Sequence, residues 1–220
     1  MNMRALPLYA TIAIFQVTNL QSWLQYPNML STRVIGNLLT DNAYLGIVAV
    51  GMTLVILSGG IDLSVGSVIA FSGVFIAVIL RETALHPLVV FAILLALTTA
   101  FGAAMGFLID RLAMPAFIVT LAGMFLARGA AYMLSIDSVP IQHPFYQTLQ
   151  KAYWLMPGKG RLTLIGVLML LTVLAGMVIA HKTRFGASVY ALGGGEATAR
   201  LMGVRQGRTV MLVYAFSGFM

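Results

Sequence analysis

Long apolar stretches, separated by short polar segments, recur along this chain of 220 residues and restrict what it can fold into. Leu88–Ile109, Ala116–Leu134 and Leu162–Ala180 each come close to the roughly 20 apolar residues with which an α-helix crosses a bilayer. Only 9% of the residues are charged, whereas a soluble domain carries about 25%. The sequence therefore predicts one all-α integral membrane domain over residues 1–220.

Three more apolar segments bring the predicted number of spans to six. Leu6–Tyr26 forms the first, although its outer end is polar. Ala43–Leu57 and Val65–Leu80 are both short, and Ser58–Ser64 interrupts them. Thr209–Met220 is apolar but shorter still, so it predicts the start of a seventh span. Because a helix that ends inside the bilayer leaves its last carbonyls without partners, we expect the chain to be a C-terminally truncated fragment of a longer protein.

Basic residues indicate how the spans are oriented, because cytoplasmic loops are enriched in Lys and Arg. Residues 181–208 are predicted to be a cytoplasmic loop because basic residues outnumber acidic ones there; its charged residues are Lys182, Arg184, Glu196, Arg200, Arg205 and Arg208. Counting back through the spans places the N-terminus in the cytoplasm, in agreement with Arg4. The same count places residues 136–161 outside, although they contain Lys151, Lys159 and Arg161. The formal net charge of +7 is thus assigned to membrane orientation and not to nucleic acid binding.

The segment Ser58–Gly66 is the best candidate for a transport site in the first half of the chain. Gly59 and Gly60 allow the backbone to leave helical geometry. Asp62 and Ser64 are good N-caps for the helix that follows. Broken helices of this kind line transport sites, because irregular backbone is tolerated at membrane depth only beside protein or water. The alternative is that Asp62 caps a helix at the cytoplasmic surface, and the depth that decides between the two is not given by the sequence.

Two further features lie inside the apolar stretches. Arg128 is a charge within Ala116–Leu134. It either faces an aqueous cavity on a translocation path or snorkels toward an interface, and a structural pairing role is slightly favoured.

Gly102 and Gly106 fit the small-residue pattern that lets two helices approach closely, but the pattern does not indicate the partner helix.

A glycine-rich segment, Gly193–Gly203, occupies the predicted cytoplasmic loop. A phosphate-binding glycine loop needs a surrounding βαβ unit, which the sequence does not predict. The segment instead predicts a short helix, Glu196–Met202, with an ion pair between Glu196 in its first turn and Arg200 in its last. Such a helix either docks another subunit or lies on anionic lipid. The candidate docking residues are Gly193, Gly194, Glu196, Arg200 and Gly203.

The sequence lacks the usual motifs of catalysis and cofactor binding. His86, His143 and His181 lie in or beside different loops, and the nucleotide-binding motif G-x-x-x-x-G-K-[ST] does not occur. The absence of cysteine excludes disulfides and thiolate metal sites. We therefore expect a membrane subunit that is not an enzyme, has no metal or cofactor, and leaves ATP hydrolysis to a partner.

Several blocks of sequence resemble, in the same order, the ribose-type ABC sugar permeases. They are Gly51–Ser67, Pro115–Met124, Arg128 with Gly129, Thr183–Gly186, Tyr190–Gly194 and Ala199–Gly203. Within this family the N-terminal half looks most like the galactofuranose permease subunit, notably at Ser31–Ile35 and Leu39–Asn42. The chain departs from the family at Gly195, where Asn is usual. The family also continues for several helices beyond the position of Met220.

The resemblance implies the permease subunit of a bacterial ABC importer that moves a monosaccharide, galactofuranose or a related pentose or hexose, across the inner membrane. Its implied partners are a second permease subunit, identical or paralogous, a periplasmic sugar-binding protein, and cytoplasmic ATPase subunits that meet Gly193–Gly203. Two alternatives remain open. One is an ion-coupled secondary transporter with Asp62 and Arg128 as coupling residues, and the other is a nonfunctional membrane fragment.

Overall fold

The computed structural model describes residues 6–26, 31–141, 143–157 and 160–220. Their helices and strands are, in chain order, α1 (Leu6–Gln25), α2 (Thr32–Asp41), α3 (Ala43–Leu57), α4 (Val65–Glu82), α5 (Pro87–Arg111), α6 (Ala116–Leu134), α7 (Pro144–Lys151), β1 (Tyr153–Met156), β2 (Gly160–Thr163), α8 (Leu164–Lys182), α9 (Arg184–Gly194), α10 (Glu196–Leu201) and α11 (Gln206–Phe219). Arg4 and Lys159, which entered the topology prediction, lie outside the described residues.

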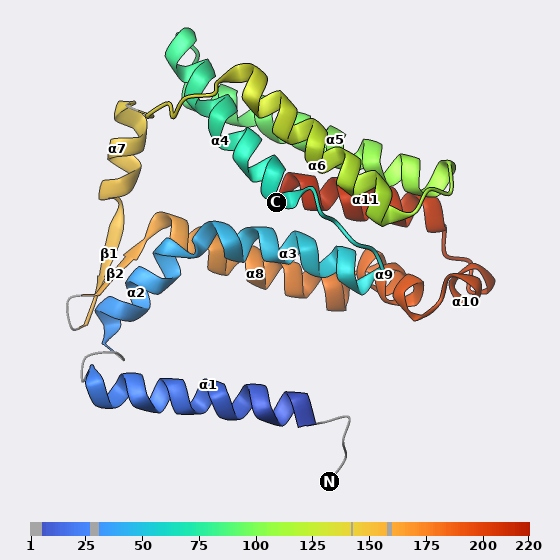
Figure 1. Ribbon diagram of the computed structural model, residues 1–220, viewed down its shortest axis with the longest axis horizontal. Helices are drawn as coiled ribbons and strands as arrows, with labels where there is room; N and C mark the ends of the chain where they lie inside the picture. The colour runs from blue at the N-terminus through green and yellow to red at the C-terminus, as the bar shows by residue number, and fades with distance from the viewer. Residues whose placement is uncertain (1–5, 27–30, 142, 158–159) are drawn as a thin grey trace.

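The long helices form two groups that α11 joins (Figure 1). In one group α3 packs along α8, and in the other α4, α5 and α6 pack together. The final helix α11 lies against both α5 and α3. The buried core is found at this junction, where Val55 of α3 meets Val189 of α9 and Val213 of α11. By contrast, α1 runs along one side of the molecule with nearly all its described side chains exposed (Figure 1).

The helical membrane fold predicted from the sequence is confirmed. Four helices within the described residues, α4, α5, α6 and α8, are long and apolar enough to cross a membrane. The pair α2 and α3 passes the same test together and bends by 57° at their junction. Ala43–Leu57 and Ala116–Leu134 coincide with predicted stretches. The full count of six spans and the start of a seventh stays a prediction.

A small β-hairpin before α8 was not expected from the sequence. Strands β1 and β2 pair antiparallel, from Tyr153 opposite Thr163 to Met156 opposite Gly160. At Gly160 an added Cβ would overlap the carbonyl of Thr32, so β2 passes directly over the start of α2. The span predicted to begin at Leu162 therefore begins at Leu164, where the Thr163 hydroxyl accepts a hydrogen bond from the Gly166 N–H at 3.2 Å.

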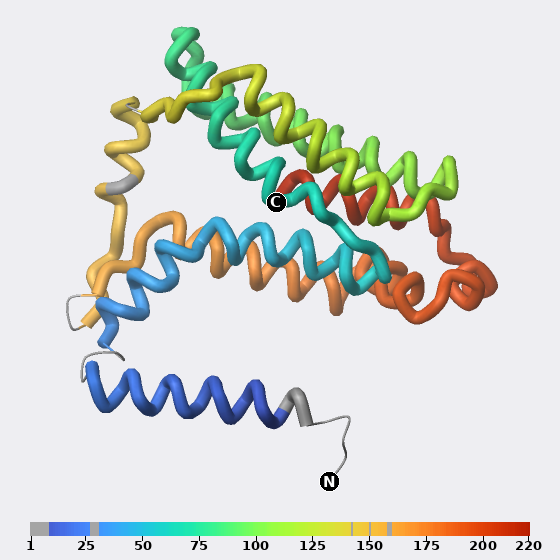
Figure 2. The backbone as a smooth tube through the Cα atoms, viewed as in Figure 1, coloured from blue at the N-terminus to red at the C-terminus, as the bar shows by residue number. Residues whose placement is uncertain are grey.

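The partner of the small-residue pattern in α5 is α11. A Cβ at Gly102 would overlap the carbonyl oxygen of Tyr214, and one at Gly106 would come within 2.7 Å of the Met211 Cα. Gly218 of α11 makes the reciprocal approach to the Thr98 carbonyl. The backbones of the two helices therefore come into close contact at these three glycines, because glycine removes the side chains that would hold them apart. Figure 2 traces the course of both helices.

Candidate functional site

The loop between α3 and α4 begins with a Schellman motif. Gly59 has a φ of 81°, in the left-handed region that favours glycine. Its N–H donates to the Ile56 carbonyl at 3.0 Å, and the Gly60 N–H donates to the Val55 carbonyl at 2.9 Å. These two bonds satisfy the last carbonyls of α3 and turn the chain back toward the bundle. The predicted helix break is thus made by the two glycines that the sequence singled out.

Asp62 lies in this loop with only 7% of its surface exposed. One carboxylate oxygen, Oδ1, accepts hydrogen bonds from the Ser64 N–H at 2.9 Å and the Ser64 hydroxyl at 2.6 Å. The other oxygen, Oδ2, accepts from the Ser217 hydroxyl of α11 at 3.2 Å. No basic side chain of the described residues pairs with Asp62. Its charge is instead stabilised by these three donors and by the positive N-terminal end of α4.

The predicted capping arrangement is wrong in its details. Ser64 occupies the N-cap position of α4, but its hydroxyl makes no capping bond to the helix. The hydroxyl donates to Asp62 instead, and Asp62 accepts from the N–H of Ser64 and not from the first turn of α4. Asp62 therefore orders the end of the loop before the helix begins. The alternative that Asp62 lies at the cytoplasmic surface concerns its depth in the bilayer and stays a prediction.

A second contact holds the loop against α11. The buried Tyr214 donates its hydroxyl to the carbonyl of Ile61 at 3.0 Å. Its hydroxyl oxygen would also lie 2.8 Å from a Cβ at Gly60, so the second glycine leaves room for the tyrosine. Tyr214 and Ser217 are three residues apart on one face of α11, and together they hold consecutive loop residues.

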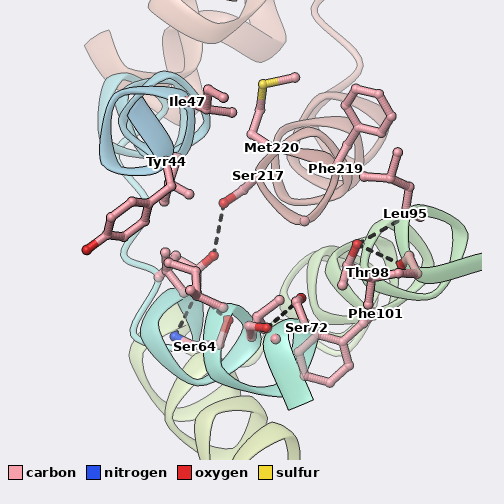
Figure 3. Close-up of a pocket in the computed structure, with 18 of the residues that line it drawn as sticks. Tyr44, Ile47, Ser64, Ser72, Leu95, Thr98, Phe101, Ser217, Phe219 and Met220 are labelled. Atoms are coloured by element: carbon pink, nitrogen blue, oxygen red, sulfur yellow. Dashed lines mark hydrogen bonds between the residues drawn. The ribbon is translucent and has the colours of Figure 1, made fainter. Parts of the chain in front are cut away.

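A cavity of about 440 Å³ opens beside this contact, between α3, α4, α5, α8 and α11. This volume lies within the range of small-molecule sites, about 300–1,000 Å³. Figure 3 shows Ser217 pointing across the cavity toward the loop, with Ser72 and Thr98 on other walls. The remaining hydroxyl groups come from Tyr44, Ser64 and Thr172, and aromatic surface comes from Phe91, Phe101 and Phe219.

The polar groups of the cavity are suited to an uncharged polyhydroxylated ligand. Asp62 is its single charged residue. Ser72 and Thr98 already donate to carbonyls of their own helices, Val68 at 2.7 Å and Leu94 at 3.1 Å. Each hydroxyl oxygen keeps acceptor capacity for a ligand hydroxyl. A few hydroxyl groups on apolar and aromatic walls give orientation without strong binding.

Arg128 does not take part in this cavity. It lines a separate groove between α4 and α6, with Ser67, Tyr132 and Asp137 among its neighbours. Its side chain is exposed, and it makes no hydrogen bond or ion pair with the described part of the chain. The structural pairing favoured from the sequence is therefore not found among the described residues. Asp62 and Arg128 lie in different sites and do not form a coupled pair.

The predicted cytoplasmic loop, residues 181–208, contains two helices, α9 and α10. The candidate docking segment, Gly193–Gly203, begins in the last turn of α9 and includes all of α10. The sequence predicted α10 as Glu196–Met202, and the structure has it at Glu196–Leu201. It ends in a second Schellman motif, in which Gly203, with a φ of 78°, donates to the Arg200 carbonyl and Val204 donates to the Ala199 carbonyl, both at 3.0 Å. Helix α9 was not predicted; its Thr183 N-cap accepts from the Gly186 N–H at 3.1 Å.

The predicted ion pair between Glu196 and Arg200 is wrong. The Arg200 Nε donates to the Gln206 Oε1 at 2.7 Å instead, which fixes the start of α11 to α10. Gly195, which replaces the usual Asn of the family, has a φ of 148° and a ψ of 123°, a conformation that residues with a Cβ rarely adopt.

The exposed surface of the docking segment is partly apolar. Leu201 and Met202 are 90% and 71% exposed, beside the exposed Glu196 and Arg200. Ala199 is buried and anchors α10. At the opposite end of the segment Gly193 is in such close contact with the Leu57 carbonyl that a Cβ would overlap it. Gly194, by contrast, has open space around it. The docking segment thus contacts the end of α3 directly.

Sequence reasoning missed Tyr214 and Ser217, which complete the site. Both lie in the final apolar segment, which was interpreted as the start of a span and not as part of a site. Two hydroxyl-bearing residues at a spacing of three in an otherwise apolar helix were the available signal. Their partners Ile61 and Asp62 are more than 150 residues away, at separations of 153 and 155, and no local pattern connects them.

A bundle of apolar helices, broken at a buried acid beside a mostly apolar cavity with a few hydroxyl groups, is the architecture of a membrane transport protein. The chain belongs to a family of ABC-transporter permeases, since residues 34–220 match the family described as the permease component of branched-chain amino acid transport systems.

Three relatives are similar to the chain over most of its length. It is 55% identical over 214 residues to the inner membrane ABC transporter permease protein YjfF of Escherichia coli (strain K12), covering 97% of this chain and 65% of the relative. It is 37% identical over 199 residues to the ribose import permease protein RbsC of the same strain, covering 88% and 60%. It is 35% identical over 218 residues to the fructose import permease protein FruG of Bifidobacterium longum (strain NCC 2705), covering 96% and 64%.

The chain therefore spans 60–65% of the length of these curated relatives. No solved structure matches it. The family and its helical membrane architecture follow from the matches, and the ribose-type resemblance found in the sequence is confirmed at that level.

Proposed function

We propose that this chain forms part of the permease subunit of an ABC importer that moves a monosaccharide across the bacterial inner membrane. The observation that carries the proposal is the cavity beside Asp62, in a chain of the ABC permease family. The relatives RbsC and FruG are named as import permeases for ribose and fructose. Among sugars, the resemblance at Ser31–Ile35 and Leu39–Asn42 makes galactofuranose the first to test.

The charge of the cavity favours a sugar over the amino acid in the name of the family. A free amino acid brings a carboxylate that needs a cation when it leaves water. No lysine or arginine lines the cavity, and its one charged residue is Asp62. A neutral sugar would need only hydroxyl groups and aromatic surface, and these are present. Specificity would come mainly from a periplasmic sugar-binding protein that delivers the substrate.

The docking segment supports a role for cytoplasmic ATPase subunits. Its apolar tip at Leu201 and Met202 is suited to a pocket on a protein partner. The exposed basic residues at and just after the segment, Arg200, Arg205 and Arg208, are suited to an acidic rim. The contact between Gly193 and Leu57, together with the bonds from α11 to Ile61 and Asp62, would carry movement of the segment to the cavity loop. This arrangement requires the N-terminus and residues 181–208 to be cytoplasmic. A second permease subunit would complete the path.

Transport by the complete importer, reconstituted in proteoliposomes, tests the proposal. We expect uptake of radiolabelled galactofuranose, ribose or galactose that requires ATP on the side of the ATPase. Variant Asp62→Asn should reduce uptake, and Asp41→Asn, at an exposed site on α2, should not. Uptake driven by a sodium or proton gradient without ATP would support the ion-coupled alternative. Uptake of leucine in preference to every sugar would overturn the sugar assignment.

A further inference from the structure

The groove that contains Arg128 lies on the opposite face of α4 from the transport cavity. Val65, Val68 and Ser72 of α4 face the cavity, whereas Ser67, Ala70 and Val74 face the groove. The groove holds about 680 Å³ and extends along α6 to residues 135–138, beyond the end of that helix. At Gly66, which lines the groove, an added Cβ would meet no atom within 4 Å, so the space beside α4 is open.

The groove presents one cation and one anion that do not pair with each other. Arg128 and Asp137 both line it. The single ion pair of the described residues is Arg81 with Glu82, so the charged atoms of Arg128 and Asp137 are more than 4.0 Å apart. Ser67 and Ser138 also line the groove, and their hydroxyl groups make no hydrogen bond to the described residues.

Apolar and aromatic side chains form an exposed surface around Arg128 in the groove. Leu63 and Tyr132, which line the groove with it, are 37% and 55% exposed. A guanidinium group within such a surface is costly unless an anion or water reaches it. Its five N–H donors fit the oxygens of a phosphate group, which can accept two of them at once.

Arg128 and Asp137 follow each other along the axis of α6 in the order in which an anion and a cation follow each other in a zwitterionic phospholipid. Arg128 lies six residues before the end of α6, about 9 Å along the axis at 1.5 Å per residue. Asp137 lies beyond the end of α6, closer to the water. In a phosphoethanolamine head group the phosphate lies next to the acyl chains and the primary ammonium group extends toward water. The apolar walls at Leu63, Val74 and Met124 would contact the acyl chains.

From this arrangement we infer that the groove between α4 and α6 binds a phospholipid whose head group carries a phosphate and a primary ammonium group. Arg128 holds the phosphate, and Asp137 holds the ammonium. The site is separate from the transport cavity and does not depend on the identity of the sugar. A lipid bound here supports the outer wall of α4, whose other face lines the cavity.

Native mass spectrometry of the purified chain, released from micelles doped with equal amounts of phosphatidylethanolamine, phosphatidylglycerol and phosphatidylcholine, tests the inference. We expect retained phosphatidylethanolamine to predominate. Arg128→Gln should lower retention of every phospholipid by about tenfold, the effect of losing hydrogen bonds to a charged group. Asp137→Asn should remove the preference for phosphatidylethanolamine and leave phosphatidylglycerol retention unchanged. Arg111→Gln, at the exposed end of α5, is the matched control and should behave as the unmodified chain.

Three results would overturn the inference. They are unchanged lipid retention in Arg128→Gln, a preference of the unmodified chain for phosphatidylglycerol, and displacement of the lipid by millimolar leucine, which would indicate a site for a free zwitterion. If Arg128→Gln does not fold, Arg128→Lys replaces it. That variant keeps the charge but loses the bidentate geometry, so it should retain the preference for phosphatidylethanolamine with weaker binding. Loss of that preference in Arg128→Lys would also contradict the site.

Discussion

Asp62 lies where the loop between α3 and α4 meets the cavity. Its carboxylate is buried and held by Ser64 and Ser217, which belong to segments far apart in the chain. A buried carboxylate without a cation is tolerated only when donors replace the water that it loses. Because Asp62 also lines the cavity, any change at Asp62 acts on the loop and on the cavity together.

Removing the carboxylate should destabilise the chain. Asp62→Ala leaves the Ser64 N–H without its acceptor, and we expect the free energy of unfolding to fall by about 2–3 kcal/mol. Asp62→Asn keeps an acceptor oxygen and should lose about 1 kcal/mol. Unfolding in detergent micelles, followed by circular dichroism, measures both, with Asp41→Asn as the control. Equal stability of Asp62→Ala and the unmodified chain would show that the hydrogen bonds of Asp62 do not stabilise the loop.

Tyr214 offers a smaller and more specific change. Tyr214→Phe removes one hydroxyl and leaves the Ile61 carbonyl without that donor. The free energy of unfolding should fall by about 1 kcal/mol, the net value of a single hydrogen bond. The same unfolding measurement applies, and Tyr9→Phe on the exposed α1 is the matched control, expected to have no effect. An equal loss of unfolding free energy in both variants would show that the Tyr214 hydroxyl does not hold the loop.

At the scale of helices and strands, the apolar helices and α10 were predictable, whereas the two strands and α9 were not. Helices α3 and α6 have the predicted ends, because turn-forming or capping residues bound each apolar run. The hairpin of β1 and β2 was missed, since strands of four residues give too little alternation to be recognised. Helix α9 was missed because Gly186 and Gly193 suggested a loop. Those glycines allow close contacts with Ala180 and Leu57 that only the folded chain reveals.

The contact between α5 and α11 gives a direct test of helix packing. A Cβ at Gly102 would overlap the Tyr214 backbone, which cannot rotate away as a side chain can. Gly102→Ala should therefore cost about 1–3 kcal/mol of unfolding free energy, as expected for overpacking. Gly129→Ala adds the same group to α6 where no atom lies within 4 Å, and its better helix propensity should raise stability by up to about 1 kcal/mol. Thermal unfolding of both variants in detergent distinguishes them, and equal effects would contradict the close contact.

At the scale of the whole molecule, the candidate site was predicted in part. The glycine break and Asp62 follow from local chemistry, and the structure brings them to the cavity. Arg128 was grouped with them because both are charges in apolar sequence, yet it faces the other side of α4. Helix α4 borders the cavity with one face and the groove with the other. The sequence alone does not show which helices pack against each face. The contribution of α11 depends on the same long-range packing.

Exposure of the docking segment predicts how the chain meets its proposed ATPase partner. Leu201→Asp places a charge on a side chain that is 90% exposed, so folding should be unaffected. Within the complete importer, the ATPase that copurifies with the permease should fall by about tenfold, because an interface of this kind depends on a few buried apolar residues. Leu155→Asp, 73% exposed on β1 and outside the candidate spans, is the control for a charge placed on a surface. If the same amount of ATPase copurifies with Leu201→Asp, the ATPase docks on another surface of the permease.

The orientation of the chain in the membrane is testable without a background signal, because the sequence contains no cysteine. Ser138, beyond the end of α6, and Thr198, in α10, are both exposed and lie at opposite ends of the bundle (Figure 1). The proposed topology places the first outside and the second in the cytoplasm. A membrane-impermeant maleimide should therefore label Ser138→Cys in intact spheroplasts and label Thr198→Cys only after the membrane is permeabilised. The reverse pattern would invert the topology, place the docking segment away from any cytoplasmic ATPase, and leave the importer proposal without its energy source.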